Sequence, residues 1–276
     1  MDQACNTDKK RNRKWRALPI LLPAFAACLL MPLAYLTQYD TGGANYFQQG
    51  AILPIIAAVL AAISALIGTV LALRTPRDQL SGKQLPAPRA ALASAIGCTA
   101  CAVALFVSMQ GGRMDWTHAL AFLLSILSAV YELTVAFCDL KQERVQDLAV
   151  LLGFLPIFTL ILLNAIHYFD QSLEMNAPLK ITIMLGLLCA MVSLTGEIRH
   201  LIGTALPRVY LMLLSWTVAA GALSALAVPI AYFVGILQDT DYLATSFAML
   251  GFFVTSAVRI VALQSAPASE KGADPS

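Results

Sequence analysis

Charged residues are scarce in this sequence of 276 residues. They make up 12% of it, while 59% of the residues are hydrophobic, and the mean hydropathy is +0.73. Soluble domains carry about 25% charged residues. This scarcity excludes an ordinary soluble globular protein and places the chain in the membrane class. The net charge of +2 gives no indication of a nucleic-acid partner; the expected partner is the lipid bilayer.

The sequence also lacks the motifs of familiar enzymes. It contains no H-E-x-x-H, no G-x-S-x-G, no P-loop and no paired-carboxylate signature. His118, His167 and His200 fall on different segments, so we do not expect them to share a metal. Cys98 and Cys101 form an isolated C-x-x-C pair inside an apolar run, which favours packing over metal or redox chemistry. We expect no cofactor, and an enzyme is the weakest functional hypothesis.

Long apolar runs are abundant. About 20 apolar residues in a helix span the hydrocarbon core, whereas a membrane β-barrel shows segments of about ten residues that alternate in polarity. The runs here are continuous and predict an all-α polytopic membrane protein of about eight transmembrane helices within residues 17–264. The predicted spans are 17–37, 50–73, 88–109, 117–139, 147–168, 178–198, 209–235 and 241–264.

The distribution of Lys and Arg predicts the orientation. Of the 18 such residues, fifteen lie in the two ends and the even-numbered loops, two (Arg113 and Lys180) in odd-numbered loops, and one (Arg259) in a span. Because positive residues are retained on the cytoplasmic side, both ends are predicted to be cytoplasmic. Residues 1–16 would form a basic cytoplasmic segment, and residues 265–276 a disordered cytoplasmic tail.

Small residues recur at intervals of four in three of the predicted spans. Such stripes let helix backbones approach closely in lipid, where packing rather than hydrophobic burial drives association. We therefore expect the second, third and seventh spans to be the most buried. The stripes consist of Ala57, Ala61 and Ala65; Ala93, Gly97 and Cys101; and Thr217, Gly221 and Ala225, the last running into a kink at Pro229.

A few ionisable residues fall inside or at the ends of predicted spans, where charge is costly and often functional. They form a candidate intramembrane polar site. One interpretation is that Arg259 reaches the interface with its long side chain. A second is that Glu132 pairs with Arg259 or, failing that, with Arg199 or His200. A third is a proton- or ion-coupled site. The site consists of Glu132, Glu197, Arg199, His200 and Arg259.

The two halves of the chain share faint landmarks. Residues 46–49 (Tyr-Phe-Gln-Gln) resemble residues 168–171 (Tyr-Phe-Asp-Gln), and residues 128–130 and 256–258 both read Ser-Ala-Val. These similarities suggest a weak 4+4 repeat, which would give a pseudo-twofold axis along the membrane normal, as in some transporters.

The region around the sixth predicted span carries a motif of about 40 residues. It comprises residues 168–170 (Tyr-Phe-Asp), 175–181 (Met-Asn-Ala-Pro-Leu-Lys-Ile), 197–199 (Glu-Ile-Arg) and 206–208 (Leu-Pro-Arg). The pattern resembles a group of multi-span membrane proteins from clostridial bacteria that has no assigned activity. The resemblance implies a bacterial plasma-membrane protein, and it implies that Asn176, Glu197, Arg199 and Arg208 belong to a shared motif.

Two functional classes fit these features. A small-solute permease, or a membrane subunit of a transport system, fits the short loops, and Glu132 would be its coupling group. A sensor, assembly factor or partner-binding scaffold would instead use Arg199, His200 and Arg208 as a docking surface. A polar cavity that reaches Glu132 would favour the permease, and a solid core around it would favour the scaffold.

Overall fold

The computed structural model describes residues 16–40, 46–75, 85–111, 115–138, 143–171 and 173–265. Within these ranges the regular structure is helical, apart from one isolated antiparallel bridge between Tyr39 and Phe47. The predicted all-α class is therefore confirmed. The terminal segments predicted to be cytoplasmic fall almost wholly outside the described residues, so their location stays a prediction.

Each helix is defined by its bounds in chain order. They are α2 (Leu18–Gln38), α3 (Leu53–Arg74), the short 3-10 helix η2 (Pro88–Ala90), α4 (Ala91–Gln110), α5 (Trp116–Phe137), α6 (Glu143–Leu152), α7 (Phe154–Phe169), α8 (Pro178–Leu201), α9 (Pro207–Gly221), α10 (Ala227–Phe233) and α11 (Thr240–Ser265).

Seven stretches in the described ranges are long and apolar enough to cross a membrane. They are α2, α3, η2 with α4, α5, α8, α11 and the run Gln146–Phe169, which comprises most of α6 and all of α7. The chain is thus a multi-span integral membrane protein.

Local sequence accounts for several helix starts. Proline lies in the first turn of α3, α8 and α9, where its missing N–H costs nothing because that amide has no partner within the helix. Asp115 caps α5 instead, accepting a hydrogen bond from the backbone N–H of His118 at 2.8 Å.

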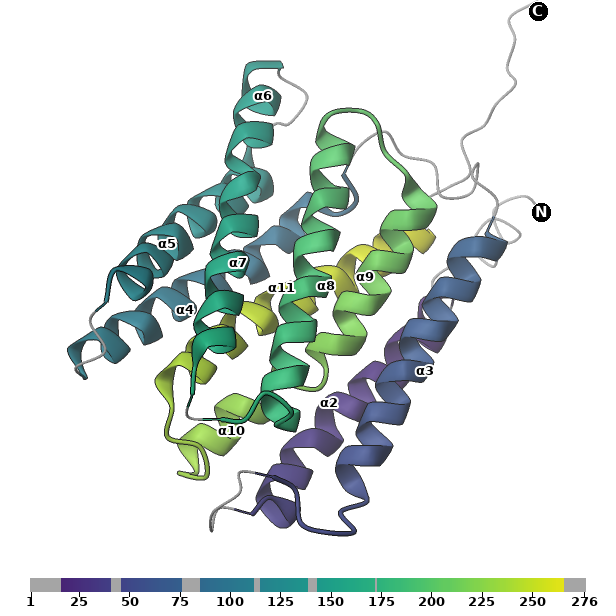
Figure 1. Cartoon of the computed structure of the whole chain (residues 1–276). Helices are drawn as coiled ribbons and strands as arrows, with labels where there is room; N and C mark the ends of the chain where they lie inside the picture. The colour runs from purple at the N-terminus through teal and green to yellow at the C-terminus, as the bar shows by residue number, and fades with distance from the viewer. Residues whose placement is uncertain are drawn as a thin grey trace, which may run out of the picture.

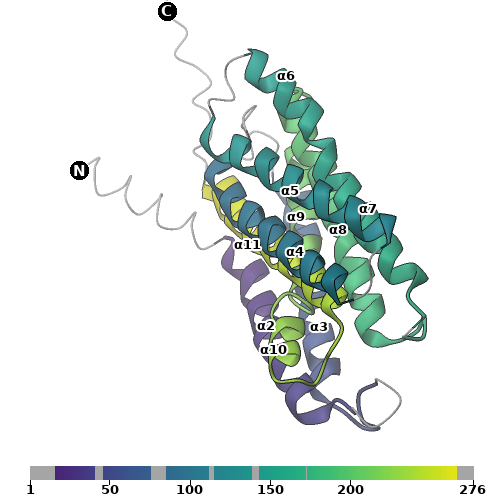
Figure 2. The ribbon, with the colours of Figure 1, turned by 90° about the vertical axis from the view of Figure 1, so that its left-hand side faces the viewer.

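The long helices form one bundle in which successive crossings run in alternating directions (Figure 1). The start of α2 and the end of α11 lie at the same end of the bundle. The view at 90° shows α4 and α11 between the α2–α3 pair and the group of α5, α7 and α8 (Figure 2). Since α11 contacts α4, α8, α9 and α10, it is the central helix.

The close approach of α4 and α11 depends on a pair of glycines. A Cβ on Gly97 would lie 2.6 Å from the carbonyl oxygen of Phe247 and 2.9 Å from the Cα of Gly251. A Cβ on Gly251 would lie 2.7 Å from the carbonyl oxygen of Ala93. No side chain fits at either position without moving backbone, so the sequence permits this contact only through glycine.

The predicted ranking of buried helices is wrong in one respect. Ala57, Ala61, Gly97, Thr217 and Gly221 do face the interior, as the small-residue stripes predict. However, 28% of the apolar membrane-spanning stretch of α3 is buried inside the protein, whereas 67% of the corresponding stretch of α11 is buried. A narrow stripe buries one face of α3 against α2 and α9, whereas α11 is surrounded by helices and buries most of its circumference.

The prediction of one continuous helix over 209–235 is also wrong. The helix ends at Gly221, residues 222–226 form turns, and a short helix follows from Ala227. Gly221 is a poor helix former, and Pro229 cannot donate to the carbonyl of Ala225 and crowds it. The kink expected at Pro229 is therefore an interruption of the helix. The 4+4 repeat stays a prediction.

We predict that Gly251→Ala loosens the contact between α4 and α11. The added methyl group meets backbone atoms, and overpacking of this kind costs about 1–3 kcal/mol. Thermal unfolding in detergent measures the loss. Gly186→Ala is the matched control, because its Cβ would meet the flexible end of Met249 rather than backbone. Equal stability of the two variants would contradict this account of the packing.

Candidate functional site

Arg259 and Glu197 form a buried ion pair between α11 and α8. Arg259 donates through both terminal nitrogens, from Nη1 to Oε2 and from Nη2 to Oε1 of Glu197, the latter at 3.0 Å. Arg259 Nη1 also donates to the hydroxyl of Tyr210 at 3.2 Å, and the hydroxyl of Tyr131 donates to Glu197 Oε1 at 3.3 Å. All four side chains are buried.

Glu132 lies beside this pair, close enough to interact electrostatically with both of its members. It is 1% exposed, and its Oε2 accepts a hydrogen bond of 2.7 Å from the hydroxyl of Ser94 at the start of α4. Its other oxygen has no hydrogen-bond partner among the described residues. We call Ser94, Tyr131, Glu132, Glu197, Tyr210 and Arg259 the arginine network.

The structure brings together three of the five candidate site residues. The prediction that Glu132 faces the interior near a polar partner is confirmed, but the partner is Ser94, and Arg259 binds Glu197 instead. Arg199 is exposed at the end of α8. His200 is buried with its ring 4.7 Å from that of Tyr210, and within the described ranges neither ring nitrogen has a hydrogen-bond partner.

A second polar cluster lies at the opposite end of α5 and α11. His118 Nδ1 is 2.6 Å from Asp115 Oδ1, and His118 Nε2 is 3.1 Å from Asp241 Oδ2. The hydroxyl of Ser108 donates to Asp241 Oδ1 at 2.7 Å. Because ionised carboxylates only accept hydrogen bonds, both nitrogens of His118 act as donors here, as an imidazolium does. We call these four residues the histidine network.

Asp115 lies outside the spans, at the start of α5. Slight burial raises the pKa of its carboxyl, but hydrogen bonds from Thr117, from the backbone N–H of His118 and from the His118 ring outweigh burial. Together with the charge of His118, they lower the pKa of Asp115 to about 2. Asp115 therefore stays ionised and fixes the position of His118.

The loop between α7 and α8 joins the same end of the bundle. The ammonium group of Lys180, a buried residue, donates to the backbone carbonyl of Asp170 at 2.6 Å, and the hydroxyl of Tyr242 donates to Asp170 Oδ2 at 3.0 Å. His167 Nε2 lies 2.7 Å from the hydroxyl oxygen of Thr245. The bond from Tyr242 holds the loop against the start of α11, the bond from Lys180 holds it against α8, and His167 joins α7 to α11.

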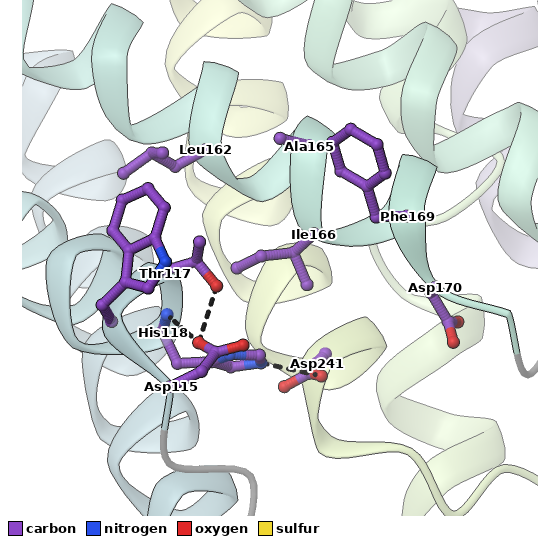
Figure 3. A pocket seen from close by; sticks show the side chains of 10 residues that line it. Asp115, Thr117, His118, Leu162, Ala165, Ile166, Phe169, Asp170 and Asp241 are labelled. Atoms are coloured by element: carbon purple, nitrogen blue, oxygen red, sulfur yellow. Dashed lines mark hydrogen bonds and ion pairs between the residues drawn. The ribbon is translucent and has the colours of Figure 1, made fainter.

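A pocket of about 630 Å³ opens between these elements. Figure 3 shows Leu162 and Ile166 of α7 on one side and Asp115, His118 and Asp241 on the other, with Asp170 at a third side. A smaller pocket of about 190 Å³ lies between α8 and α9 beside Arg199 and Tyr210. Glu132 lines neither of these two pockets.

Sequence reasoning missed the histidine network. His118 and Asp241 lie near the ends of spans, where water is close and charge is not heavily penalised, so the cost of intramembrane charge does not single them out. One signal was present: Asp115 stands three residues before His118, which is the spacing of a helix cap. Nothing in the sequence indicates that Asp241 meets His118.

No protein-family model matches the chain, and comparisons with curated proteins and with solved structures also gave no match.

We predict that Arg259→Met destabilises the protein by about 3–5 kcal/mol, because it leaves Glu197 buried without its cation. The double variant Arg259→Met with Glu197→Leu should recover most of this loss, since no unpaired charge remains. Unfolding in detergent measures both. Arg199→Met, on the exposed surface of α8, is the control and should change stability by less than about 0.5 kcal/mol. A single variant as stable as the control would refute the pairing.

We predict that Asp115→Ala loses about 1 kcal/mol of stability near neutral pH, because α5 loses its N-cap. The pKa of Asp115 is lowered on folding, so its contribution is complete above about pH 4, the ordinary range of Asp, and declines as the pH falls towards the folded value. Unfolding measured across this interval should show the difference between wild type and variant shrinking with acid. A difference that grows in acid would contradict this assignment.

Proposed function

We propose that this multi-span membrane protein is a proton-coupled small-solute permease, or a membrane subunit of a transport system, in which Glu132 takes up and releases the proton. The observation that carries the proposal is the charge count in the arginine network. The network holds two carboxyl groups, those of Glu132 and Glu197, but one guanidinium, and Glu197 occupies both terminal nitrogens of Arg259. A proton on Glu132 makes the buried cluster neutral.

The setting of Glu132 supports a proton on its carboxyl group. An ionised carboxylate needs several hydrogen-bond donors, and Glu132 has Ser94 on one oxygen and no partner within the described ranges on the other. Isolated charge in a membrane interior costs at least about 2.5 kcal/mol. Exchange with water then requires the helices around Glu132 to open, which is the motion that alternating access supplies.

Two further features fit a transport protein. Helices α4, α5 and α11 each carry members of both polar networks, so a shift of any of these helices would displace both networks. Residues 222–226 form turns that interrupt the helical run between α9 and α10. Discontinuous helices of this kind occur at the sites of several transporter folds. Ser224 in this interruption is buried, and its hydroxyl has no partner in the described part of the chain.

Reconstituted proteoliposomes that contain a pH-sensitive dye test the proposal. Gradients of small solutes, one from each of the classes of amines, amino acids, sugars and carboxylates, are imposed across the vesicles. We expect at least one class to drive proton movement in the wild-type protein and Glu132→Gln to abolish it, because Gln cannot carry a proton. Glu174→Gln, at an exposed carboxylate outside both networks, is the matched control and should retain it. Proton movement that persists in Glu132→Gln would rule the coupling role out.

A non-transporting scaffold is the second candidate, and the closure of the arginine network favours it. Glu132 is 1% exposed and lines neither described pocket, which fits a solid core. Of the docking residues expected from sequence, Arg199 alone is exposed, since His200 is buried and Arg208 donates to the carbonyl of Thr75. Co-purification from the native membrane that is lost in Arg199→Glu and retained in Glu132→Gln would favour this candidate.

We also infer that the chain lies in a bacterial plasma membrane. The motif around α8 supports this inference through its resemblance to the clostridial membrane proteins. Within the motif, Glu197 forms the ion pair with Arg259, and Asn176 accepts a hydrogen bond of 2.6 Å from the hydroxyl of Tyr46.

A further inference from the structure

We propose that the groove between α8 and α9 binds a phospholipid with an anionic headgroup. The phosphate of this lipid lies on Arg199, and one of its acyl chains lies along the groove. The proposal goes beyond the proposed function and involves neither Glu132 nor transport. It would therefore stand if the role proposed for Glu132 failed.

The wall of the groove is apolar and open to the surroundings of the bundle. Val192 of α8, Leu206 and Val209 of α9 line it, and they are 49%, 42% and 44% exposed, respectively. The volume of about 190 Å³ is smaller than the range of about 300–1,000 Å³ that small-molecule sites occupy. The groove therefore fits a segment of an acyl chain better than it fits an entire solute.

A glycine sets the close packing beneath the groove. Gly196 and Tyr210 both line it, and a Cβ on Gly196 would lie 2.7 Å from Cδ2 of the Tyr210 ring. Because Gly196 has no side chain, the ring packs directly against α8, and no side chain from this position of α8 fills the groove.

The depth of the groove suits a lipid. The candidate membrane span of α8 ends at Leu201, so Arg199 lies two residues, or about 3 Å along the helix axis, inside that end. Val192 lies a further seven residues, or about 10 Å, from the same end. A phospholipid presents its phosphate at the interface and its acyl chains below it, so one molecule can meet both the arginine and the apolar wall. A soluble partner would reach only the arginine.

Arg199 supplies the charge that selects an anionic headgroup. It is exposed, and it is the one charged residue among the described residues that line the groove. Its side chain makes no hydrogen bond or ion pair with a described residue, and the carboxylate two positions before it, Glu197, is bound to Arg259. A guanidinium without a carboxylate partner keeps its donors for the oxygens of a phosphate.

The start of α9 adds positive potential at the same end of the groove. This helix has no side-chain cap, and the backbone N–H groups of Arg208 and Val209 in its first turn have no partner within the helix. Arg208 donates from Nε to the backbone carbonyl of Thr75 at 2.9 Å. That acceptor is neutral, so the charge of Arg208 is not compensated by it.

The groove lies at the end of the bundle that is predicted to be cytoplasmic. Thr75 follows the end of α3, and the connection from α8 to α9 lies at the end where α2 begins and α11 ends (Figure 1). Anionic lipids give the cytoplasmic leaflet its negative surface, and basic pockets between spans on that side bind anionic headgroups.

Native mass spectrometry of the full chain in detergent tests the proposal. The protein is titrated with dioleoyl phosphatidylglycerol and, separately, with dioleoyl phosphatidylcholine, which has the same chains but a headgroup without net charge. We expect the first molecule of phosphatidylglycerol to bind about fivefold more tightly than the first molecule of phosphatidylcholine, as one arginine near the membrane surface provides.

Arg199→Met removes the charge and keeps a long side chain, so it should abolish this preference. Arg89→Met makes the same change at an exposed arginine of η2, outside the groove, and it should change the affinity for phosphatidylglycerol by less than about twofold.

Val192→Trp tests the groove itself. It fills the groove from an exposed position and leaves Arg199 in place, so it should weaken the binding of phosphatidylglycerol by about threefold to tenfold through lost packing of the acyl chain. Inorganic phosphate, which has the charge without the chain, should not displace phosphatidylglycerol at equal concentration.

Equal affinity for the two lipids, or an effect of Arg89→Met as large as that of Arg199→Met, would overturn the proposal. Unchanged affinity in Val192→Trp, or displacement by inorganic phosphate, would also overturn it, because the acyl chain would then have no part in binding. A protein that co-purifies with the wild type but not with Arg199→Met, while lipid binding is unchanged, would assign the arginine to a protein partner instead.

Discussion

The free-energy cost of burying charged side chains away from water constrains this structure more than any other interaction. Arg259 and Glu197 can be buried between α8 and α11 only because the guanidinium and the carboxylate meet in two parallel hydrogen bonds, with Tyr131 and Tyr210 as further partners. A buried pair of this kind adds little net stability, but it strongly penalises any arrangement that separates the partners. It therefore fixes how α8 and α11 lie against each other.

Close packing of small residues makes that arrangement possible. Gly97 and Gly251 bring α4 against α11, and Ser94, which lies beside this contact, donates to Glu132 on α5, the other neighbour of α4. At the other end of the same helices, Ser108 of α4 and His118 of α5 meet Asp241 of α11. Members of both polar networks thus lie at the two ends of α4, α5 and α11, and the arginine network extends further to α8 and α9.

The positions of most helices could be predicted from the sequence, because hydropathy depends on composition alone. The interruption between α9 and α10 could not, since its residues are as apolar as a helix and only Gly221 and Pro229 mark it. The inward position of Glu132 followed from the cost of its charge. Its hydrogen-bond partner could not be predicted, because Ser94 lies 38 residues away and nothing in the sequence states which helices are neighbours.

The same limit explains why the prediction that Arg259 pairs with Glu132 is wrong. Glu132 and Glu197 both lie at depths that suit it, and the choice depends on whether α11 turns its arginine towards α5 or α8. Helix rotation is set by packing around the entire helix, and α11 is enclosed on most sides. Sequence patterns that describe one stripe at a time do not contain that information.

Infrared difference spectroscopy across a pH titration tests the central claim that Glu132 carries an exchangeable proton. At neutral pH the wild-type protein should show the carbonyl stretch of a protonated carboxylic acid in an apolar environment. The band should disappear at alkaline pH, be absent from Glu132→Gln and persist in Glu174→Gln. A neutral-pH spectrum without that band, or a band that survives in Glu132→Gln, would contradict the account.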